Sequence, residues 1–137
     1  MDLLTGKWTR ILFVTLCFVF SVVGFLIKLP SGFRHHDKEL HMLFYFLAAA
    51  FLNLLFSNKN LAIHILIFCI LYGFGMSIEY AQAYTNELFH VRFHGRYDPE
   101  DVHANLKGLI AFSVLWVVVV ALLFVIRGNR KTANEEA

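Results

Sequence analysis

The amino-acid sequence predicts an all-α, polytopic membrane protein with four transmembrane helices and a polar cluster at one membrane face. Of its 137 residues, 58% are hydrophobic and only 16% are charged, whereas a soluble domain carries about 25% charged residues. The apolar residues also gather into four uncharged runs of 17 or 18 residues, at positions 11–27, 40–56, 61–78 and 109–126. Because about 20 apolar residues cross the core of a bilayer, each run is a candidate transmembrane helix.

We expect a single domain over residues 1–137, because a chain of this length is too short for two. The predicted helices cover about residues 8–29, 38–56, 61–82 and 99–126. Asp98 and Pro99 are an N-cap and a first helical residue for the last of these helices. Its end is expected at the basic residues Arg127, Arg130 and Lys131.

The first run resembles a signal peptide, because Lys7 and Arg10 precede it. However, it is longer than the usual apolar region of about 7–15 residues, and no cleavage site of small residues follows it. We therefore expect an uncleaved transmembrane helix, with Trp8 near the membrane–water interface.

The net charge of +2 is too small for a nucleic-acid-binding surface, so no nucleic-acid partner is expected. Cys17 and Cys69 lie inside apolar runs and are not spaced as a metal or redox motif. We expect both to be buried packing thiols. Gly73 and Gly75, in the third run, are expected to allow close helix approach.

Four crossings place the end of the first helix, the start of the second, the end of the third and the start of the fourth at the same membrane face. Polar groups inside helix ends cost several kcal/mol if they stay unpaired, so those at this face should meet. The predicted polar cluster consists of Asp37, Lys38, His41, Glu79, Gln82, Arg96, Asp101 and Asn105.

Individual members of this cluster have simpler alternatives. Asp37 is equally well explained as an N-cap, and His41 as a core histidine. Glu79 is the hardest to dismiss, because a carboxylate is unfavourable near the C-terminal end of a helix. A structural ion pair of Glu79 is therefore expected, with Arg96 as the first choice of partner and Lys38 as the alternative. His64, outside the cluster, is interpreted as a buried or interfacial histidine rather than a ligand.

At the start of the last helix, N-capping accounts for Asp98 but only partly for Asp101. Asn105, four residues later, shares a helix face with Asp101. We assign both Asp101 and Asn105 to the polar cluster.

The orientation is evenly balanced in the count of basic residues. Six lie near the termini and the 57–60 turn, and six lie at the face of the polar cluster. The second set is interleaved with acidic residues, whereas the first is nearly free of them. By the positive-inside rule this favours cytoplasmic termini and a polar cluster that faces outwards.

The polar residues resemble those of the VanZ-like family of small bacterial membrane proteins. The matching segments lie within residues 37–112 and are Asp37-Lys38-Glu39-Leu40-His41 with Tyr45, Glu79-x-x-Gln82, and Gly95-Arg96 followed by Asp101-x-x-x-Asn105-x-x-Gly108. The resemblance implies an integral protein of the bacterial cytoplasmic membrane with a part in cell-envelope biology. The family is named for a protein linked to resistance against the glycopeptide antibiotic teicoplanin, and the resemblance supplies no biochemical activity.

The leading hypothesis is a polar pocket that binds membrane lipids, specifically a lipid-linked cell-wall precursor or another anionic headgroup. Arg96, helped by Lys38 and Arg34, would hold phosphate through charge-assisted hydrogen bonds. Glu79, Gln82 and Asn105 would recognise the hydroxyl and amide groups of a sugar or peptide. Asp37 and Asp101 would orient His41 and Arg96.

No cofactor is expected. A metal site could draw on His90 and His94, four residues apart, with His35, His36, His41 and Asp37 on the same face. No recognised metal-ligand spacing is present, so the sequence favours no metal.

Two other function classes stay open. One is an intramembrane enzyme acting on headgroups, with His41 as general base, oriented by Asp37, and Glu79 or Asp101 as general acid. The other is a structural subunit of a larger envelope complex, whose partner protein is unknown.

Overall fold

A computed structural model describes residues 6–26, 36–89 and 98–135, and within these ranges the chain contains helices and no strand. The elements are α1 (Lys7–Leu26), α2 (Asp37–Leu52), a π-helical turn η2 (Asn53–Ser57), α3 (Leu61–Phe89) and α4 (Pro99–Glu135). Four helical segments, one of them α2 continued through η2, are long and apolar enough to cross a membrane. The predicted all-α polytopic membrane fold is therefore confirmed.

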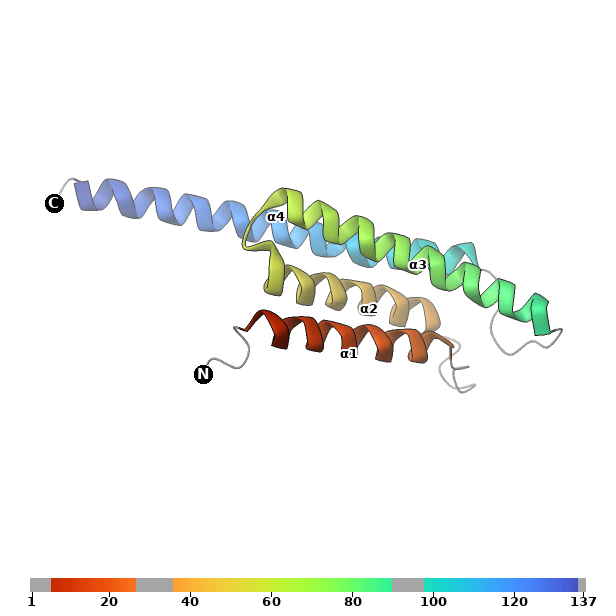
Figure 1. Ribbon diagram of the computed structural model, residues 1–137. Helices are drawn as coiled ribbons and strands as arrows, with labels where there is room; N and C mark the ends of the chain where they lie inside the picture. The colour runs from red at the N-terminus through yellow and green to blue at the C-terminus, as the bar shows by residue number, and fades with distance from the viewer. Residues whose placement is uncertain (1–5, 27–35, 90–97, 136–137) are drawn as a thin grey trace.

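Two helices run further than predicted. α3 continues to Phe89 instead of ending near residue 82, and α4 continues to Glu135 instead of ending near residue 126. The prediction that basic residues end α4 was wrong, because Lys and Arg are good helix formers and water does not interrupt a helix. In Figure 1 the C-terminal part of α4 extends well beyond the other three helices. Residues 27–29 of the first predicted helix lie outside the described ranges.

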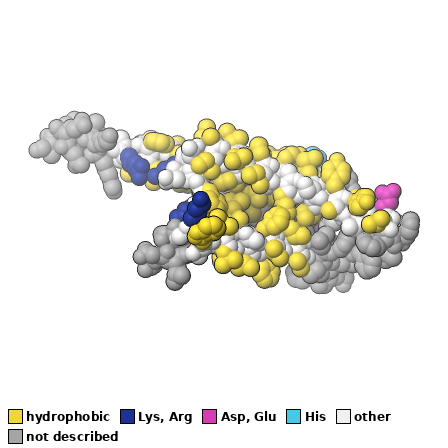
Figure 2. All heavy atoms as spheres, viewed as in Figure 1, with side chains coloured by type: hydrophobic (Ala, Val, Ile, Leu, Met, Phe, Trp, Pro, Cys, Tyr) yellow, Lys and Arg dark blue, Asp and Glu magenta, His cyan; other side chains and the backbone are white. Residues whose placement is uncertain are grey.

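The described helix ends lie at the two ends of the bundle in the order expected for four successive membrane crossings. In Figure 1 α1 begins at the end of the bundle over which α4 leaves it, and α2 and α4 begin at the opposite end, where α3 terminates. Figure 2 shows a surface of mostly hydrophobic side chains between the ends, with Lys and Arg side chains toward the end where α1 starts. The start of α2, the end of α3 and the start of α4 can therefore build one site.

α2 and α4 form the most extensive helix pair among the described elements. The apolar core lies between α2, α3 and α4 and consists of Tyr45, Ala49, Ile67, Leu71, Leu109 and Phe112. Phe112 packs edge-on against Phe46, with ring centroids 5.6 Å apart. α1 contributes no buried residue over Lys7–Gly24 and lies beside α2 at the margin of the bundle (Figure 1).

Two glycines allow this close packing. A Cβ atom at Gly108 would overlap the backbone carbonyl oxygen of Met42, so α4 can approach α2 only through a glycine. A Cβ atom at Gly75 would lie 2.9 Å from Tyr45 Oη and also 2.9 Å from Asn105 Nδ2. Gly75 thus has the predicted role, but a Cβ atom at Gly73 would meet nothing within 4 Å.

The prediction of buried cysteines was wrong, since Cys17 and Cys69 are both free and exposed on the protein surface. The physical reason is that a membrane helix presents apolar residues to lipid as well as to the core. An apolar run therefore does not predict which of its residues are buried within the protein.

The turn between η2 and α3 uses backbone conformations that few residues adopt. Asn58 and Lys59 have φ of 40° and 66°, in the left-handed region. Asn tolerates this region better than most residues. Asn60 then caps α3, because its Oδ1 accepts hydrogen bonds from the N–H groups of Ala62 (2.9 Å) and Ile63 (3.3 Å).

Candidate functional site

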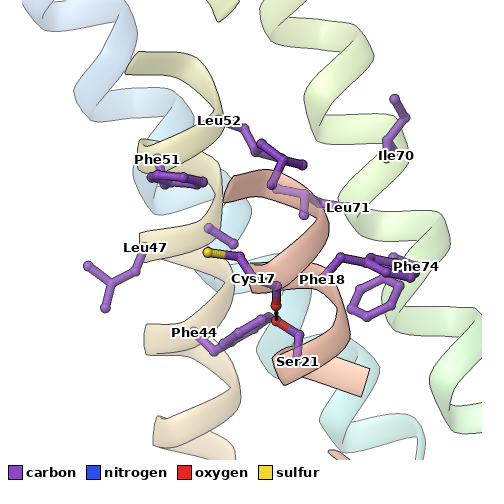
Figure 3. A pocket seen from close by; sticks show the side chains of 12 residues that line it. Cys17, Phe18, Ser21, Phe44, Leu47, Phe51, Leu52, Ile70, Leu71 and Phe74 are labelled. Carbon is purple, nitrogen blue, oxygen red and sulfur yellow. Dashed lines mark hydrogen bonds between the residues drawn. The ribbon is translucent and has the colours of Figure 1, made fainter. Parts of the chain in front are cut away.

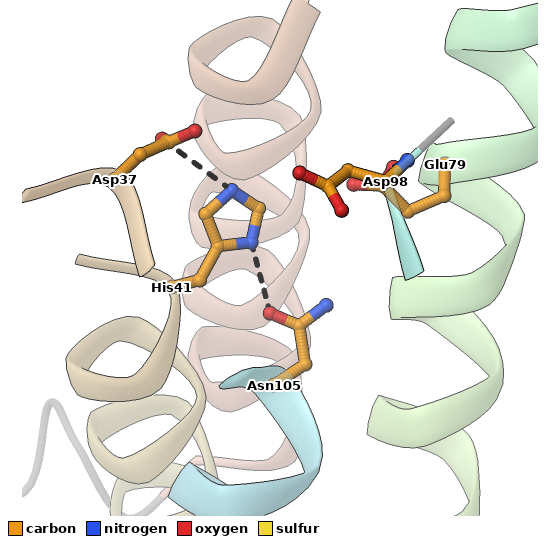
Figure 4. A network of polar contacts seen from close by, with 5 residues as sticks. All are labelled: Asp37, His41, Glu79, Asp98 and Asn105. Atoms are coloured by element: carbon orange, nitrogen blue, oxygen red, sulfur yellow. Dashed lines mark hydrogen bonds and ion pairs between the residues drawn. The ribbon is translucent and has the colours of Figure 1, made fainter. Parts of the chain in front are cut away.

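The polar site is organised around His41, in the second turn of α2. Its Nδ1–H donates a hydrogen bond of 2.9 Å to Oδ1 of Asn105 on α4. Its Nε2 lies 3.8 Å from Oδ1 of Asp37, one turn earlier on α2. Figure 4 shows the ring held between these two side chains. His41 and Asn105 are only 8% and 2% exposed. They were predicted to lie close together, and their contact is buried in the α2–α4 interface.

Glu79 reaches the same region from α3 and is 1% exposed. Its Oε2 accepts a hydrogen bond of 3.2 Å from the backbone N–H of Asp98, just before α4. Its carboxylate is close enough to Asp101 and His41 for direct electrostatic interaction. Since α3 continues to Phe89, Glu79 is not in its last turn, which corrects the position inferred from the sequence. The carboxylate instead fixes the start of α4 against α3.

Two carboxylates at the start of α4, those of Asp98 and Asp101, have different roles. Oδ1 of Asp98 accepts a hydrogen bond of 2.9 Å from the N–H of Glu100, which confirms the predicted N-cap. Asp101 is the third residue of the helix, and its backbone N–H donates to the carbonyl of Asp98 at 3.1 Å. Its side chain is directed elsewhere. For Asp37 the N-cap alternative was wrong, because His36 occupies that position.

Two carboxylate oxygens in this site are buried without a hydrogen-bond partner among the residues that the structure describes. They are Oε1 of Glu79 and Oδ1 of Asp101. A buried acceptor left unmatched costs about 1–3 kcal/mol, and more when it is charged. Such atoms in a membrane helix bundle therefore indicate a place where a donor or a cation binds.

Tyr45 belongs to the same site, although it was named only in the family resemblance and not among the predicted members of the polar cluster. It is 1% exposed, and its hydroxyl lies beside Gly75 together with the amide of Asn105. Tyr45 is four residues after His41, so the two share a face of α2. That spacing was the available signal.

The structure does not test the predicted phosphate contacts of the basic residues. Lys38 forms an ion pair with Glu100 across the starts of α2 and α4, and both side chains are exposed at the rim. Arg96 and Arg34 lie outside the described residues, so the expected Glu79–Arg96 ion pair stays a prediction. Gln82 is half-buried on α3, one turn after Glu79.

A second buried polar group lies near the opposite end of the bundle. His64 is 5% exposed, and its Nδ1 lies 2.9 Å from Asn53 Oδ1 while its Nε2 lies 3.1 Å from Ser113 Oγ. The ring stacks on Trp116, with centroids 4.3 Å apart. A Ser–His–Asn set can support nucleophilic catalysis, but here Ser113 Oγ also donates to the carbonyl of Leu109 at 2.9 Å. We interpret this group as structural, and its buried histidine agrees with the sequence-based interpretation.

An apolar cavity of about 360 Å³ lies between the middle parts of α1, α2 and α3 (Figure 3). Phe44 on its wall is one turn after His41, and Phe74 is less than two turns before Glu79. Phe18 from α1 contacts Phe74, with ring centroids 5.3 Å apart. The cavity thus extends along the middle of the bundle, and Phe44 and Phe74 are its lining residues nearest in sequence to His41 and Glu79.

No protein-family model, curated protein or solved structure matches the chain. The resemblance to the VanZ-like family consequently gains no support from these comparisons and stays a prediction.

Proposed function

We propose that this integral membrane protein acts in the cell envelope by binding the headgroup of a lipid-linked molecule at its polar site. The observation that carries the proposal is a pair of buried oxygens without a partner among the described residues, Glu79 Oε1 and Asp101 Oδ1. An apolar cavity of about 360 Å³ farther along the bundle supports it. A ligand that complements both surfaces has polar hydrogen-bond donors at one end and a hydrocarbon chain at the other.

The hydrogen-bond acceptors of the site indicate which chemical groups a bound headgroup would carry. Carboxylate oxygens and the carbonyl oxygen of Asn105 accept hydrogen bonds, so they suit the hydroxyl and amide groups of a sugar or peptide. Phosphate on the same ligand would be bound by Arg96 and Arg34, which flank the described site in sequence. Lys38 would join them by leaving Glu100, at small cost, because exposed ion pairs contribute only about 0.2–1 kcal/mol.

The hydrocarbon chain would lie in the cavity between α1, α2 and α3. Its walls are formed largely by aromatic and aliphatic side chains, among them Phe18, Phe44 and Phe74. A chain in this position keeps apolar surroundings while its headgroup stays at the helix ends. A lipid-linked cell-wall precursor has this combination of groups and is the ligand class we propose.

The membrane and the orientation are part of the proposal. We assign the protein to the bacterial cytoplasmic membrane, with cytoplasmic termini and the polar site facing outwards. Support comes from the basic residues at the opposite end from the site, Lys7, Arg10, Lys59 and Arg127. They have few acidic neighbours, whereas the equal number of basic residues at the site is interleaved with acidic ones, so the positive-inside rule favours a cytoplasmic location for the first set.

The test is equilibrium binding of a lipid-linked cell-wall precursor to the purified full chain in nanodiscs. Arg96→Ala is compared with Arg127→Ala, a matched loss of one arginine at the other end of the protein. Loss of charge-assisted hydrogen bonds to phosphate should weaken binding by roughly 10–100-fold in Arg96→Ala alone.

Equal affinity of the wild type and Arg96→Ala would refute the assigned phosphate contact, and no binding by the wild type would refute the proposed ligand class. A His41→Ala variant separates binding from catalysis. If the wild type converts the precursor and this variant binds it without conversion, the enzyme alternative is correct.

A further inference from the structure

Three metal-ligating side chains from two helices converge in the polar site. One oxygen of Asp37, one ring nitrogen of His41 and one oxygen of Asp101 all lie within 4.8 Å of one another. Asp37 and His41 are four residues apart on α2 and share a helix face. Asp101 approaches them from the first turn of α4. Ligands bound tetrahedrally to one Zn²⁺ ion at 2.0–2.2 Å are about 3.3–3.6 Å apart, so the three atoms need to move closer by about 1 Å at most to bind one ion.

Asn105 prepares His41 for this role. The amide oxygen of Asn105 accepts a hydrogen bond from Nδ1–H of His41 at 2.9 Å. In a neutral imidazole whose proton is on Nδ1, the lone pair is on Nε2, the nitrogen on the side of Asp37. Metal-bound histidines nearly always donate their second ring N–H to such an acceptor, which fixes both tautomer and ring orientation.

Asp101 supplies a second, independent observation. Its Oδ1 is buried and has no hydrogen-bond partner within residues 6–26, 36–89 and 98–135. N-capping does not explain this atom, because Asp98 caps α4. The oxygen belongs to one of the three side chains that converge on His41, where a cation would satisfy it.

The local charge also favours a cation. Asp37, Glu79, Asp98 and Asp101 bring four carboxyl groups to this end of the bundle, and the described lysine at its rim, Lys38, is paired with Glu100. A protonated His41 would compensate one negative charge, but its Nε2 lies 3.8 Å from Asp37 Oδ1, beyond hydrogen-bond length. A divalent ion would bridge that gap and compensate two charges.

We propose that Asp37, His41 and Asp101 bind one divalent metal ion, with His41 ligating through Nε2. Two carboxylates and one imidazole suit Zn²⁺ and its neighbours among the transition metals better than Mg²⁺ or Ca²⁺, which prefer oxygen ligands alone. Three protein ligands leave a coordination position for water. The site is distinct from the histidine-rich set considered from sequence, because its third ligand is Asp101.

The experiment measures the binding of Zn²⁺ alone, by isothermal titration calorimetry, to the full chain purified in detergent without a polyhistidine tag. The wild type should bind one ion per chain, and Asp101→Asn, which keeps the side-chain shape, should bind at least tenfold more weakly. Glu39→Gln is the matched control, since Glu39 is exposed on the same turn of α2 and should leave binding unchanged. No lipid is present, so this result is separate from that of the headgroup experiment.

A second measurement does not depend on the folding of Asp101→Asn. Co²⁺ added to the wild type should give visible absorption bands of a low-coordinate nitrogen–oxygen site, and added Zn²⁺ should abolish them. A double variant, His90→Ala with His94→Ala, should keep these bands. Absence of stoichiometric metal binding by the wild type would overturn the proposal, as would equal affinity in Asp101→Asn or loss of the bands in the double histidine variant.

Discussion

The glycine at position 108 determines how closely α2 and α4 can hold the polar site together. A Cβ atom there would overlap the carbonyl oxygen of Met42 and would lie 3.0 Å from the carbonyl carbon of Met42 and 3.1 Å from the backbone nitrogen of Phe46. All three neighbours are helix backbone atoms, which cannot rotate away as a side chain does. Gly108→Ala should therefore force the two helices apart.

The size of the effect follows from the distances. Carbon atoms in normal contact are about 3.5–4.0 Å apart, so the helices must separate by about 1 Å. Asn105 lies one turn before Gly108, and a separation of that size stretches its 2.9 Å hydrogen bond to His41 beyond the usual 2.7–3.2 Å. Overpacking costs about 1–3 kcal/mol and a lost buried hydrogen bond a similar amount. The free energy of unfolding should fall by about 2–6 kcal/mol.

The assay is equilibrium unfolding in mixed micelles with increasing sodium dodecyl sulfate, followed by tryptophan fluorescence. Gly73→Ala is the matched control, because a Cβ atom there meets nothing within 4 Å, and it should leave stability unchanged or slightly increase it. If Gly108→Ala proves as stable as Gly73→Ala, within about 0.5 kcal/mol, the close approach of α2 and α4 through this glycine is wrong.

Three further predictions concern other contacts. Glu79→Gln keeps an oxygen acceptor for the N–H of Asp98 and should match the wild type in unfolding, whereas Glu79→Ala should lose about 1 kcal/mol; equal values would contradict the contact. His64→Ala removes two hydrogen bonds and the stack on Trp116 and should cost about 2–4 kcal/mol without changing headgroup or metal affinity, so a weakened affinity would contradict a purely structural role. Lys59→Gly should raise stability by up to about 1 kcal/mol, because φ at this position is 66° and only glycine adopts it without strain; a Lys59→Ala variant that is equally stabilised would show that strain is not the cause.

Much of the fold was predictable because hydrophobic run length and the parity of crossings are properties of the sequence alone. They were enough to identify the four helices and to bring His41, Glu79, Asp101 and Asn105 to one end of the bundle. Asp98 followed from local capping chemistry. The ends of α3 and α4 were not predictable in the same way, because hydrophobicity marks where a membrane ends and not where a helix ends.

The detailed contacts required the three-dimensional packing. Parity brings side chains to one membrane face but does not choose partners among them. His41 binds the amide of Asn105, and Glu79 binds the backbone of Asp98, and spacing along the chain selected neither pair. The grouping of Asp37, His41 and Asp101 likewise depends on the position of α4 against α2, which Gly108 sets and which spacing along the chain does not express.

The described helices differ in length, and this affects how the protein fits the bilayer. At 1.5 Å per residue, α1, with 20 residues, spans about 30 Å, which equals the thickness of a typical hydrocarbon core. α4, with 37 residues, spans about 55 Å. The apolar runs of the two helices are nearly equal, at 17 and 18 residues, so a thicker bilayer is mismatched to both. α1 contributes no buried residue over Lys7–Gly24, so packing holds it least and it is the helix that would tilt or shift. Because α1 forms one wall of the apolar cavity, membrane thickness itself would adjust the width of that cavity.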